Sequence, residues 1–336
     1  MFSETLYDQY RISVQEWYSC GLYEGASDGK KDYLFVPLRE PLDSVQTKIQ
    51  LSEQLKSAGV ANIAHYLNPL ENKSTKASAP QNKMLVFQVP KDDRAHSEHE
   101  LTELATLHTL TRSQAPSHMN PYSVRRWPVW WKKRLHQLEG WHQKINQQVN
   151  YSNFDQLFLI TFPYYRGRIE TAIQWIEDCV NAPAENVEEV ALSHYKFNSR
   201  TWPIINPNGP QIKLWTDWMW DHPTRDIAEY VRQGIFEEER IPSLPNLIEP
   251  YQRYHPQTYQ NHRLILGRLM FPLAYVEAIE NYYQLEDTRR EAVETEDLEQ
   301  LIAEEEKYLQ GVSKIKNEAG IYPGLLWFEQ TEPPQM

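Results

Sequence analysis

The chain has little cysteine and little glycine for its length. Its 336 residues include two cysteines and 12 glycines. Cys20 and Cys179 are too few for a disulfide framework, which fits a protein made in a reducing compartment. Cys179 lies on the apolar side of a predicted helix, so we expect it to be a small core residue. Neither Gly-x-Ser-x-Gly nor Cys-x-x-Cys occurs, so nucleophilic acyl transfer has no support in the sequence.

The sequence also lacks the segments that direct a chain into or across a membrane. Its start, MFSETLYDQYRISVQEW, has neither the basic beginning nor the apolar centre of a secretory signal, so we expect no signal peptide. The most apolar segments, FDQLFLITFPYY and LILGRLMFPLAYV, are shorter than the roughly 18 residues of a spanning helix. A formal net charge of −12 disfavours binding to nucleic acid or anionic lipid. We therefore expect a globular protein with no membrane insertion and no nucleic-acid partner.

Aromatic side chains are what the chain has in quantity. It contains 11 Trp and 20 Tyr, which predict large aromatic packing surfaces. The length favours two lobes over one. Residues 1–92 hold strand-like segments around one helix that ends at Gly59: YRISVQEWYSC, DYLFVPL and KMLVFQV. Residues 93–336 have mainly helical periodicity. We predict an α+β fold with a small strand-rich lobe, 1–92, and a larger, mainly helical lobe, 93–336.

One predicted helix in the second lobe combines aromatic and basic residues. VRRWPVWWKKRLHQLEGWHQKI places Trp127, Trp131, Leu135, Leu138 and Ile145 on one face, with its cations elsewhere. The simpler interpretation is a packed helix with a solvated basic side. A surface that binds nucleic acid or another anion by aromatic stacking is the alternative, which the net charge disfavours. The apolar face is expected to lie in the core in either case.

Two stretches of this lobe carry the residues that matter for chemistry. ALSHYKFNSRTW, residues 191–202, and WTDWMWDHPTRDIAEYV, residues 215–231, each read as a short strand followed by a loop, and the second continues into a helix. Together with the strand-rich part before them, they resemble the aminoglycoside-phosphotransferase type of protein-kinase-like fold. That family has a His-Gly-Asp loop with a later Asn, then Ile-Asp-Trp and Asp-Leu-Ala. The second stretch is the more specific of the two.

A narrower resemblance covers residues 20–325. DWMWDHPTRDIAEYVR and the later GRLMFPLAYVEAIENYY are similar to the YutH branch of the CotS family of bacterial endospore coat-associated proteins. This resemblance implies a protein of the spore coat, made in the mother-cell cytoplasm, with other spore coat proteins as partners.

The resemblance puts unsuitable residues at the catalytic positions. Lys196 stands where the family has its catalytic aspartate, and an ammonium cannot accept a proton unless burial or cationic neighbours make it neutral. Thr201 stands where the family has a magnesium-binding Asn, and a hydroxyl is a weaker ligand. DYLFVPL, the candidate third strand, has no lysine at its centre. We therefore consider the loop with His194, Lys196 and Thr201 degenerate, assign no catalytic residue and expect His194 to be structural.

Two carboxylates keep their places in the pattern. Asp217 is a candidate ligand for one divalent cation, although a lone carboxylate makes a poor magnesium site. It is also the carboxylate with which we expect Lys196 to pair. Asp226, at the start of the helical RDIAEYV, is expected to be structural, capping the helix and bracing the loop, and Asp221 to be a turn residue. No cofactor is assigned, and ATP with Mg²⁺ is the candidate if one binds.

The sequence thus favours a catalytically degenerate, kinase-like protein, a pseudokinase, with a structural or interaction role in spore coat assembly. The alternative is an ATP-dependent phosphotransferase that acts on a small hydroxyl-bearing metabolite with rearranged catalytic groups. A third interpretation is a module that binds nucleotide or another ligand without turnover.

Overall fold

The chain forms two compact units, which we describe separately. Unit 1 comprises Met1–Leu107 and His194–Trp218, and unit 2 comprises His108–Ser193 and Met219–Met336. The computed structural model describes residues 2–38, 41–70, 84–90, 99–112, 114–115, 124–182, 189–205, 209–237, 243–285 and 295–321. The lobes predicted at residues 1–92 and 93–336 were defined by type of secondary structure, and that boundary stays a prediction.

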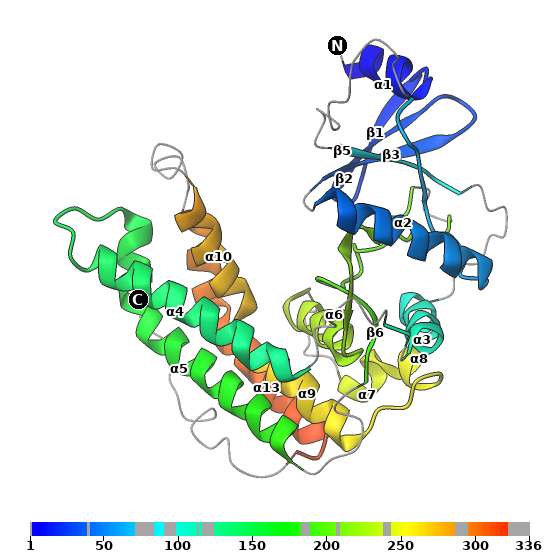
Figure 1. Cartoon of the computed structure of the whole chain (residues 1–336). Helices are drawn as coiled ribbons and strands as arrows, with labels where there is room; N and C mark the ends of the chain where they lie inside the picture. Colours follow the sequence, from blue (N-terminus) through cyan, green and yellow to red (C-terminus); the bar gives the residue numbers. More distant parts are fainter. Residues whose placement is uncertain are drawn as a thin grey trace. The chain divides into compact units, whose positions relative to one another are not determined.

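Unit 1 is built on a five-stranded antiparallel sheet (Figure 1). Its order is β1-β2-β3-β5-β4, and the strands are β1 (Glu16–Cys20), β2 (Tyr23–Ser27), β3 (Asp32–Pro37), β4 (His65–Tyr66) and β5 (Met84–Gln88). The predicted segments DYLFVPL and KMLVFQV pair as β3 and β5, with Leu34 opposite Phe87. Both side chains are fully buried because these strands lie inside the sheet.

The start of the chain differs from the prediction. The expected strand YRISVQEWYSC starts later than its sequence suggests, because Tyr10 ends helix α1 (Phe2–Tyr10), residues 11–15 are not strand and β1 begins only at Glu16. Leu6 and Ile12 pack into a core cluster with Phe35, so tertiary contacts outweigh the strand-like composition. Within the stretch GLYEGASDG, residues 21–29, residues 23–27 form β2. Gly21, with φ of 60°, makes the tight turn between β1 and β2.

The helix predicted to end at Gly59 is α2 (Leu42–Ser57), which lies in unit 1 together with α1. It ends at Ala58, and Gly59 follows with φ of 92°, a left-handed conformation that glycine adopts without strain. The first part of α3 (Glu100–Thr111) and the segment from residue 194 to 218 complete the unit.

Unit 2 is mainly helical, and its longest helices are α4 (Trp127–Ile145) and α5 (Asn153–Asn181). They pack side by side (Figure 1). The predicted apolar face of α4 is buried. The apolar segment FDQLFLITFPYY and the residues after it, up to Asn181, form one helix, α5. This helix continues through Pro163 without a break. It begins with a capping box in which Ser152 and Asp155 exchange backbone hydrogen bonds. Cys179 is fully buried in this helix, which confirms it as a core residue.

The remaining elements of unit 2 are shorter. The stretch GRLMFPLAYVEAIENYY spans two helices, because Pro272 follows the end of α9 and precedes α10. The elements are η1 (Val124–Arg126), β6 (Ala191–His194), β7 (Trp218–Asp221), α6 (Thr224–Glu237), α7 (Leu244–Leu247), α8 (Glu249–Gln252), α9 (Tyr259–Met270), α10 (Leu273–Gln284), α12 (Glu296–Ala303) and α13 (Glu305–Glu318). Strands β6 and β7 pair with each other. Across the described ranges, no helix is long and apolar enough to cross a membrane.

Arginine side chains cap the carboxyl end of α9 inside unit 2. A helix leaves its last four carbonyl groups without helical partners, and here all four accept hydrogen bonds from buried side chains. Arg168 Nη2 donates to Met270 O, Arg232 Nη1 to Phe271 O, Arg232 Nη2 to Arg268 O and Tyr308 Oη to Leu269 O. Glu305 pairs with Arg168, and Glu229 pairs with Arg232 and Arg268. This network is the charged centre of the unit.

Candidate functional site

His194 ends β6 and is fully buried. The indole Nε1 of Trp202 donates a hydrogen bond to His194 Nε2 over 3.2 Å, and the two rings meet edge to face. An indole N–H can only donate, so Nε2 accepts and the imidazole carries its proton on Nδ1. The Nε2 atom is thereby occupied by a structural partner.

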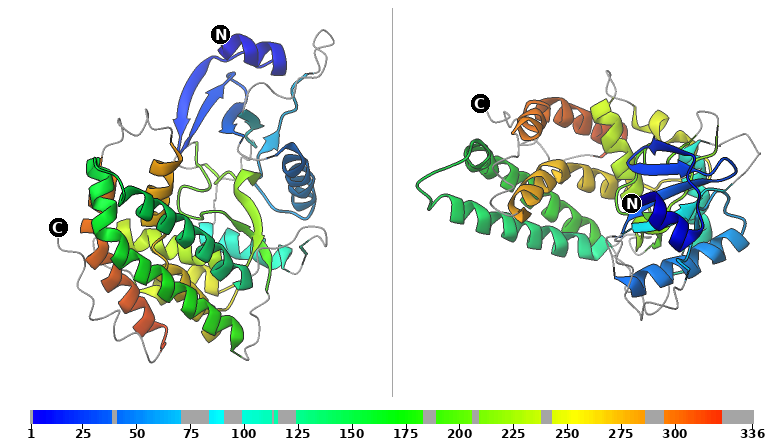
Figure 2. Two further views of the ribbon diagram at one scale, coloured as in Figure 1. Left: turned by 60° about the vertical axis from the view of Figure 1, so that its left-hand side comes forward. Right: turned by 90° about the horizontal axis from the view of Figure 1, so that it is seen from above.

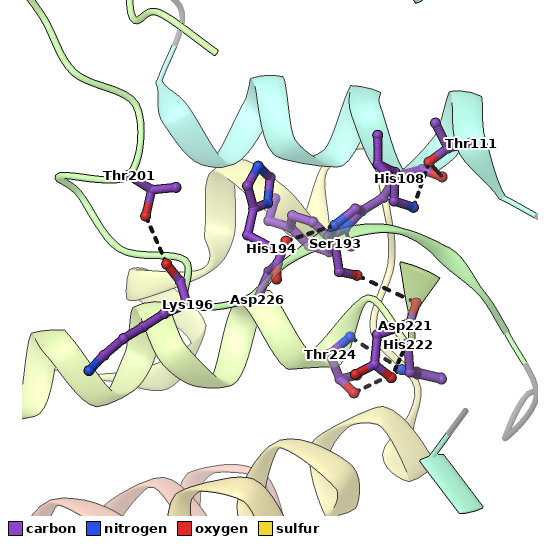
Figure 3. A network of polar contacts seen from close by, with 12 residues as sticks. His108, Thr111, Ser193, His194, Lys196, Thr201, Asp221, His222, Thr224 and Asp226 are labelled. Carbon is purple, nitrogen blue, oxygen red and sulfur yellow. Dashed lines mark hydrogen bonds and ion pairs between the residues drawn. The ribbon is translucent and has the colours of Figure 1, made fainter. Parts of the chain in front are cut away.

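The loop after His194 is braced by its own side chains (Figure 3). Thr201 Oγ1 donates to Lys196 O over 3.0 Å and accepts from Asn198 N over 2.8 Å. Asn198 Oδ1 in turn accepts from Arg200 N over 2.8 Å. The hydroxyl at the position of the family's magnesium ligand therefore serves the loop itself. The side chain of Lys196 is exposed.

Asp217 lies next to this loop within unit 1. It ends the short helix η2 (Trp215–Asp217), and its carbonyl oxygen accepts a hydrogen bond from Tyr195 N over 2.8 Å. The backbone contact puts residue 217 within reach of the loop from 194 to 201, as the spacing of the two motifs implies. The expected ion pair between Lys196 and Asp217 stays a prediction.

A lysine of α2 that no sequence pattern singled out lies close to Asp217. Lys48 Nζ donates to the carbonyl oxygen of Thr216, the residue before Asp217, over 2.7 Å. No lysine occurs in β3, where Leu34, Phe35 and Val36 are buried. A cation thus comes to the neighbourhood of Asp217 from a helix. Sequence periodicity gave no signal for this contact, because nothing in the pattern distinguishes Lys48 from Lys56, the other lysine of α2.

Unit 1 also contains a buried lysine, Lys213, that no sequence pattern singled out. Lys213 is 2% exposed, pairs with Glu103 and donates to Ala61 O over 3.2 Å. Burial lowers the pKa of the Lys213 ammonium, although Glu103 opposes that change. Its Nζ also lies 4.7 Å from the ring centroid of Trp202. Lys213 therefore holds the indole that in turn holds His194.

We predict that Trp202→Phe destabilises the protein by about 1–3 kcal/mol, because it leaves His194 Nε2 buried without its donor and weakens the contact with Lys213. Urea denaturation measures the loss. In the unmodified protein, ¹⁵N NMR of the imidazole should show Nε2 without a proton. A protonated Nε2 would contradict the assigned hydrogen bond.

Asp226 belongs to unit 2 and is fully buried. It lies inside the first turn of α6, not at its cap, because its N–H already donates to Pro223 O. Its Oδ2 lies 3.3 Å from His108 Nε2, and His108 Nδ1 lies 2.7 Å from Tyr251 Oη (Figure 3). Burial raises the pKa of Tyr251 well above its usual range. These contacts link α6 to α3 and α8, which supports the expected structural role.

Asp221 is more than the turn residue that the sequence suggests. It ends β7, is fully buried and accepts hydrogen bonds from Trp127 Nε1 over 3.0 Å and from its neighbour's N–H, His222 N, over 2.7 Å. Arg225 Nη1 pairs with its second oxygen at 2.8 Å. A carboxylate so enclosed by donors is a structural centre for β7, α4 and α6.

Divalent cations usually take several oxygen ligands. Among the residues that the structure describes, no group of three or more His, Cys, Asp or Glu side chains is arranged to hold a metal ion. A metal at Asp217 would therefore depend on other donors, and Asp217 stays a candidate ligand.

The fold and the order of these elements define a class of protein. Over 94% of the chain and 95% of the other, the structure is similar to an aminoglycoside phosphotransferase from Alicyclobacillus acidocaldarius, with a TM-score of 0.63 and 13% identity. A spectinomycin phosphotransferase, solved with ADP and spectinomycin, matches 98% of each chain with a TM-score of 0.57 and 13% identity. At these identities the likeness shows the fold alone. It confirms the predicted α+β, protein-kinase-like fold with a strand-rich amino-terminal part and a mainly helical carboxyl-terminal part.

Sequence comparison narrows the class to a family. Residues 3–315 match the family described as "Spore coat putative kinase YutH", and the chain belongs to that family. The endospore coat-associated protein YutH of Bacillus subtilis (strain 168) is 29% identical over 197 residues. That match spans 56% of this chain and 55% of the relative, so about half of each is aligned. The predicted family is confirmed.

Proposed function

We propose that this protein is a catalytically degenerate member of its family, a pseudokinase with a structural or interaction role in spore coat assembly. The observation that carries the proposal is the loop from 194 to 201, whose key groups serve the fold. His194 Nε2 accepts from Trp202, the Thr201 hydroxyl braces the loop and the exposed Lys196 replaces a proton acceptor. Loss of a general base alone removes roughly 10²–10⁴ in rate.

The coat setting of the proposal rests on the relative from B. subtilis, which is endospore coat-associated. We propose that the chain is made in the mother-cell cytoplasm, is deposited on the coat and has other coat proteins as partners. A fluorescent fusion in sporulating cells should form a shell around the forespore. A signal that stays diffuse in the mother cell would contradict the proposed location in the spore coat.

The scaffold role requires no cofactor, and this gives its test with the purified protein. ATP, alone or with Mg²⁺, should leave the melting temperature unchanged, whereas a ligand at a hundredfold excess over its dissociation constant would stabilise the fold by about 2.7 kcal/mol. A ligand blank and an ATP-binding kinase of the same fold serve as negative and positive controls. A clear upward shift without turnover would favour the nucleotide-binding module instead.

The second candidate is an ATP-dependent phosphotransferase acting on a small hydroxyl-bearing metabolite, with ATP and Mg²⁺ as cofactors. The Lys48 ammonium favours it, because its contact with Thr216 brings a cation next to Asp217 although β3 has no lysine. Phosphoryl transfer by the purified protein that Asp217→Ala abolishes would establish this function and overturn the first. Lys196→Asp alone should restore no transfer, because β3 still lacks its lysine and residue 201 is still threonine.

A further inference from the structure

The exposed side of α4 is basic and partly apolar. Val129 and Trp130 are 52% and 44% exposed, and Lys132, Lys133 and His136 are exposed beside them. Lys132 also forms an ion pair with Glu177 of α5. Lys133 Nζ lies 4.7 Å from the ring centroid of Trp130. We call the five exposed residues of α4 the basic face. Large apolar side chains exposed next to cations are typical of a surface that meets another molecule.

An acidic surface lies elsewhere in the same unit. Residues 295–306 contain six acidic residues and no lysine or arginine. Glu296, Asp297, Glu299 and Glu306 are exposed on α12 and α13, and we call them the acidic face. Two of them accept hydrogen bonds from neutral side chains, Glu299 from Thr295 and Glu306 from Gln310. Those bonds leave their negative charges in place.

The two faces occupy different sides of unit 2. Helix α10 packs against both α4 and α12. In the right-hand view of Figure 2, α10 lies between α4 and the pair α12 and α13. Within one copy, α10 therefore separates the basic face from the acidic face. Contact between the two faces then needs a second molecule.

We propose that the basic face of one copy binds the acidic face of a second copy. Charge complementarity favours this partner, because the exposed cations of α4 on one copy match the exposed carboxylates of α12 and α13 on another. The contact joins two different surfaces, so each added copy leaves one basic and one acidic face open. Such a contact extends into a chain of molecules unless a rotation closes it into a ring.

Self-association would give the proposed interaction role a specific partner, a second copy of this chain. The contact itself can be tested without the proposed function, and only its place in the spore coat rests on that function. Sedimentation velocity of the purified protein should show assemblies that grow with concentration at low salt. They should dissociate in 1 M salt, where the Debye length falls to about 3 Å. A monomer at every concentration in low salt would overturn the inference and leave the coat proposal to its own test in spores.

Charge reversal tests which surfaces meet. The variant Lys132→Glu with Lys133→Glu makes both faces acidic. The variant that combines Glu296→Lys, Asp297→Lys, Glu299→Lys and Glu306→Lys makes both faces basic. Each alone should associate at least about tenfold more weakly than the unmodified protein, because like charges then meet across the contact. Mixing the two variants should restore assembly, since each supplies the face that the other repels.

A matched control separates the contact from the change in net charge. Lys30→Glu with Lys31→Glu reverses another adjacent pair of exposed lysines, before β3 in unit 1. It should leave assembly close to that of the unmodified protein. Circular dichroism confirms that every variant is folded. Unimpaired association of either reversed variant, or failure of the mixture to assemble, would overturn the assignment of the two faces.

Discussion

Replacement of Arg232 by methionine should lower the free energy of unfolding by about 3–5 kcal/mol, the usual effect of breaking a buried ion pair. Arg232 is 7% exposed and pairs with Glu229 at 3.0 Å. It also donates to two carbonyl groups at the end of α9 and, over 2.7 Å, to Tyr308 Oη. Methionine keeps much of the length but offers no donor, so Glu229 keeps only Arg268 of its two arginine partners and two carbonyl oxygens lose their donor.

Urea denaturation followed by circular dichroism measures this loss. Arg253→Met is the control, because Arg253 pairs with Glu249 on the surface and its side chain is 68% exposed. Exposed ion pairs contribute about 0–1 kcal/mol, so this variant should unfold almost as the unmodified protein does. Equal losses for the two arginines would show that the buried cap of α9 carries no special stability.

Acid should destabilise the protein through Glu229. Burial of this carboxyl raises its pKa, but Arg232 and Arg268 more than offset burial and lower the pKa from 4.5 to about 2. A carboxyl with a lowered folded-state pKa contributes stability that is complete above its unfolded pKa and is lost as the pH falls toward the folded value. Between pH 4.5 and 2, unfolding should therefore become easier by about 3 kcal/mol, at 1.36 kcal/mol for each pKa unit.

Glu229→Gln isolates the contribution of this carboxyl. The variant should be less stable at neutral pH, because two buried arginines lose their counter-charge, and its stability should fall less steeply with acid. Glu170→Gln is the matched control, since Glu170 is half exposed and pairs with Arg166 on the surface of α5. An unchanged acid slope in Glu229→Gln would show that other carboxyl groups set the acid limit.

The family was readable from the sequence because its motifs are local. DWMWDHPTRDIAEYVR keeps its order and spacing in one continuous stretch, so no tertiary information is needed to recognise it. Lys196 and Thr201 likewise stand at fixed distances from His194, which exposed the unusual loop before any contact was known. Helices such as α4 were predicted because a burial pattern with a helical period is also a local property.

The beginning of the chain was misjudged for the opposite reason. Residues 10–14 have strand-like side chains, but Ile12 and Leu6 are recruited into the core beside Phe35, and packing outweighs so weak a preference. The strand β2 escaped notice because its glycine and small residues resemble a turn until β1 and β3 pair with it.

The sequence by itself determined the family and the mainly helical character of the second part, and it led to the prediction that Lys196 and Thr201 stand in place of catalytic groups. Only the tertiary structure decided which residues far apart in the sequence contact one another. Lys48 is 168 positions from Thr216, Trp127 is 94 from Asp221 and Lys213 is 110 from Glu103. No periodicity or motif reports such pairs, because they form only when distant segments pack together and burial forces each charge and each polar group to find a partner.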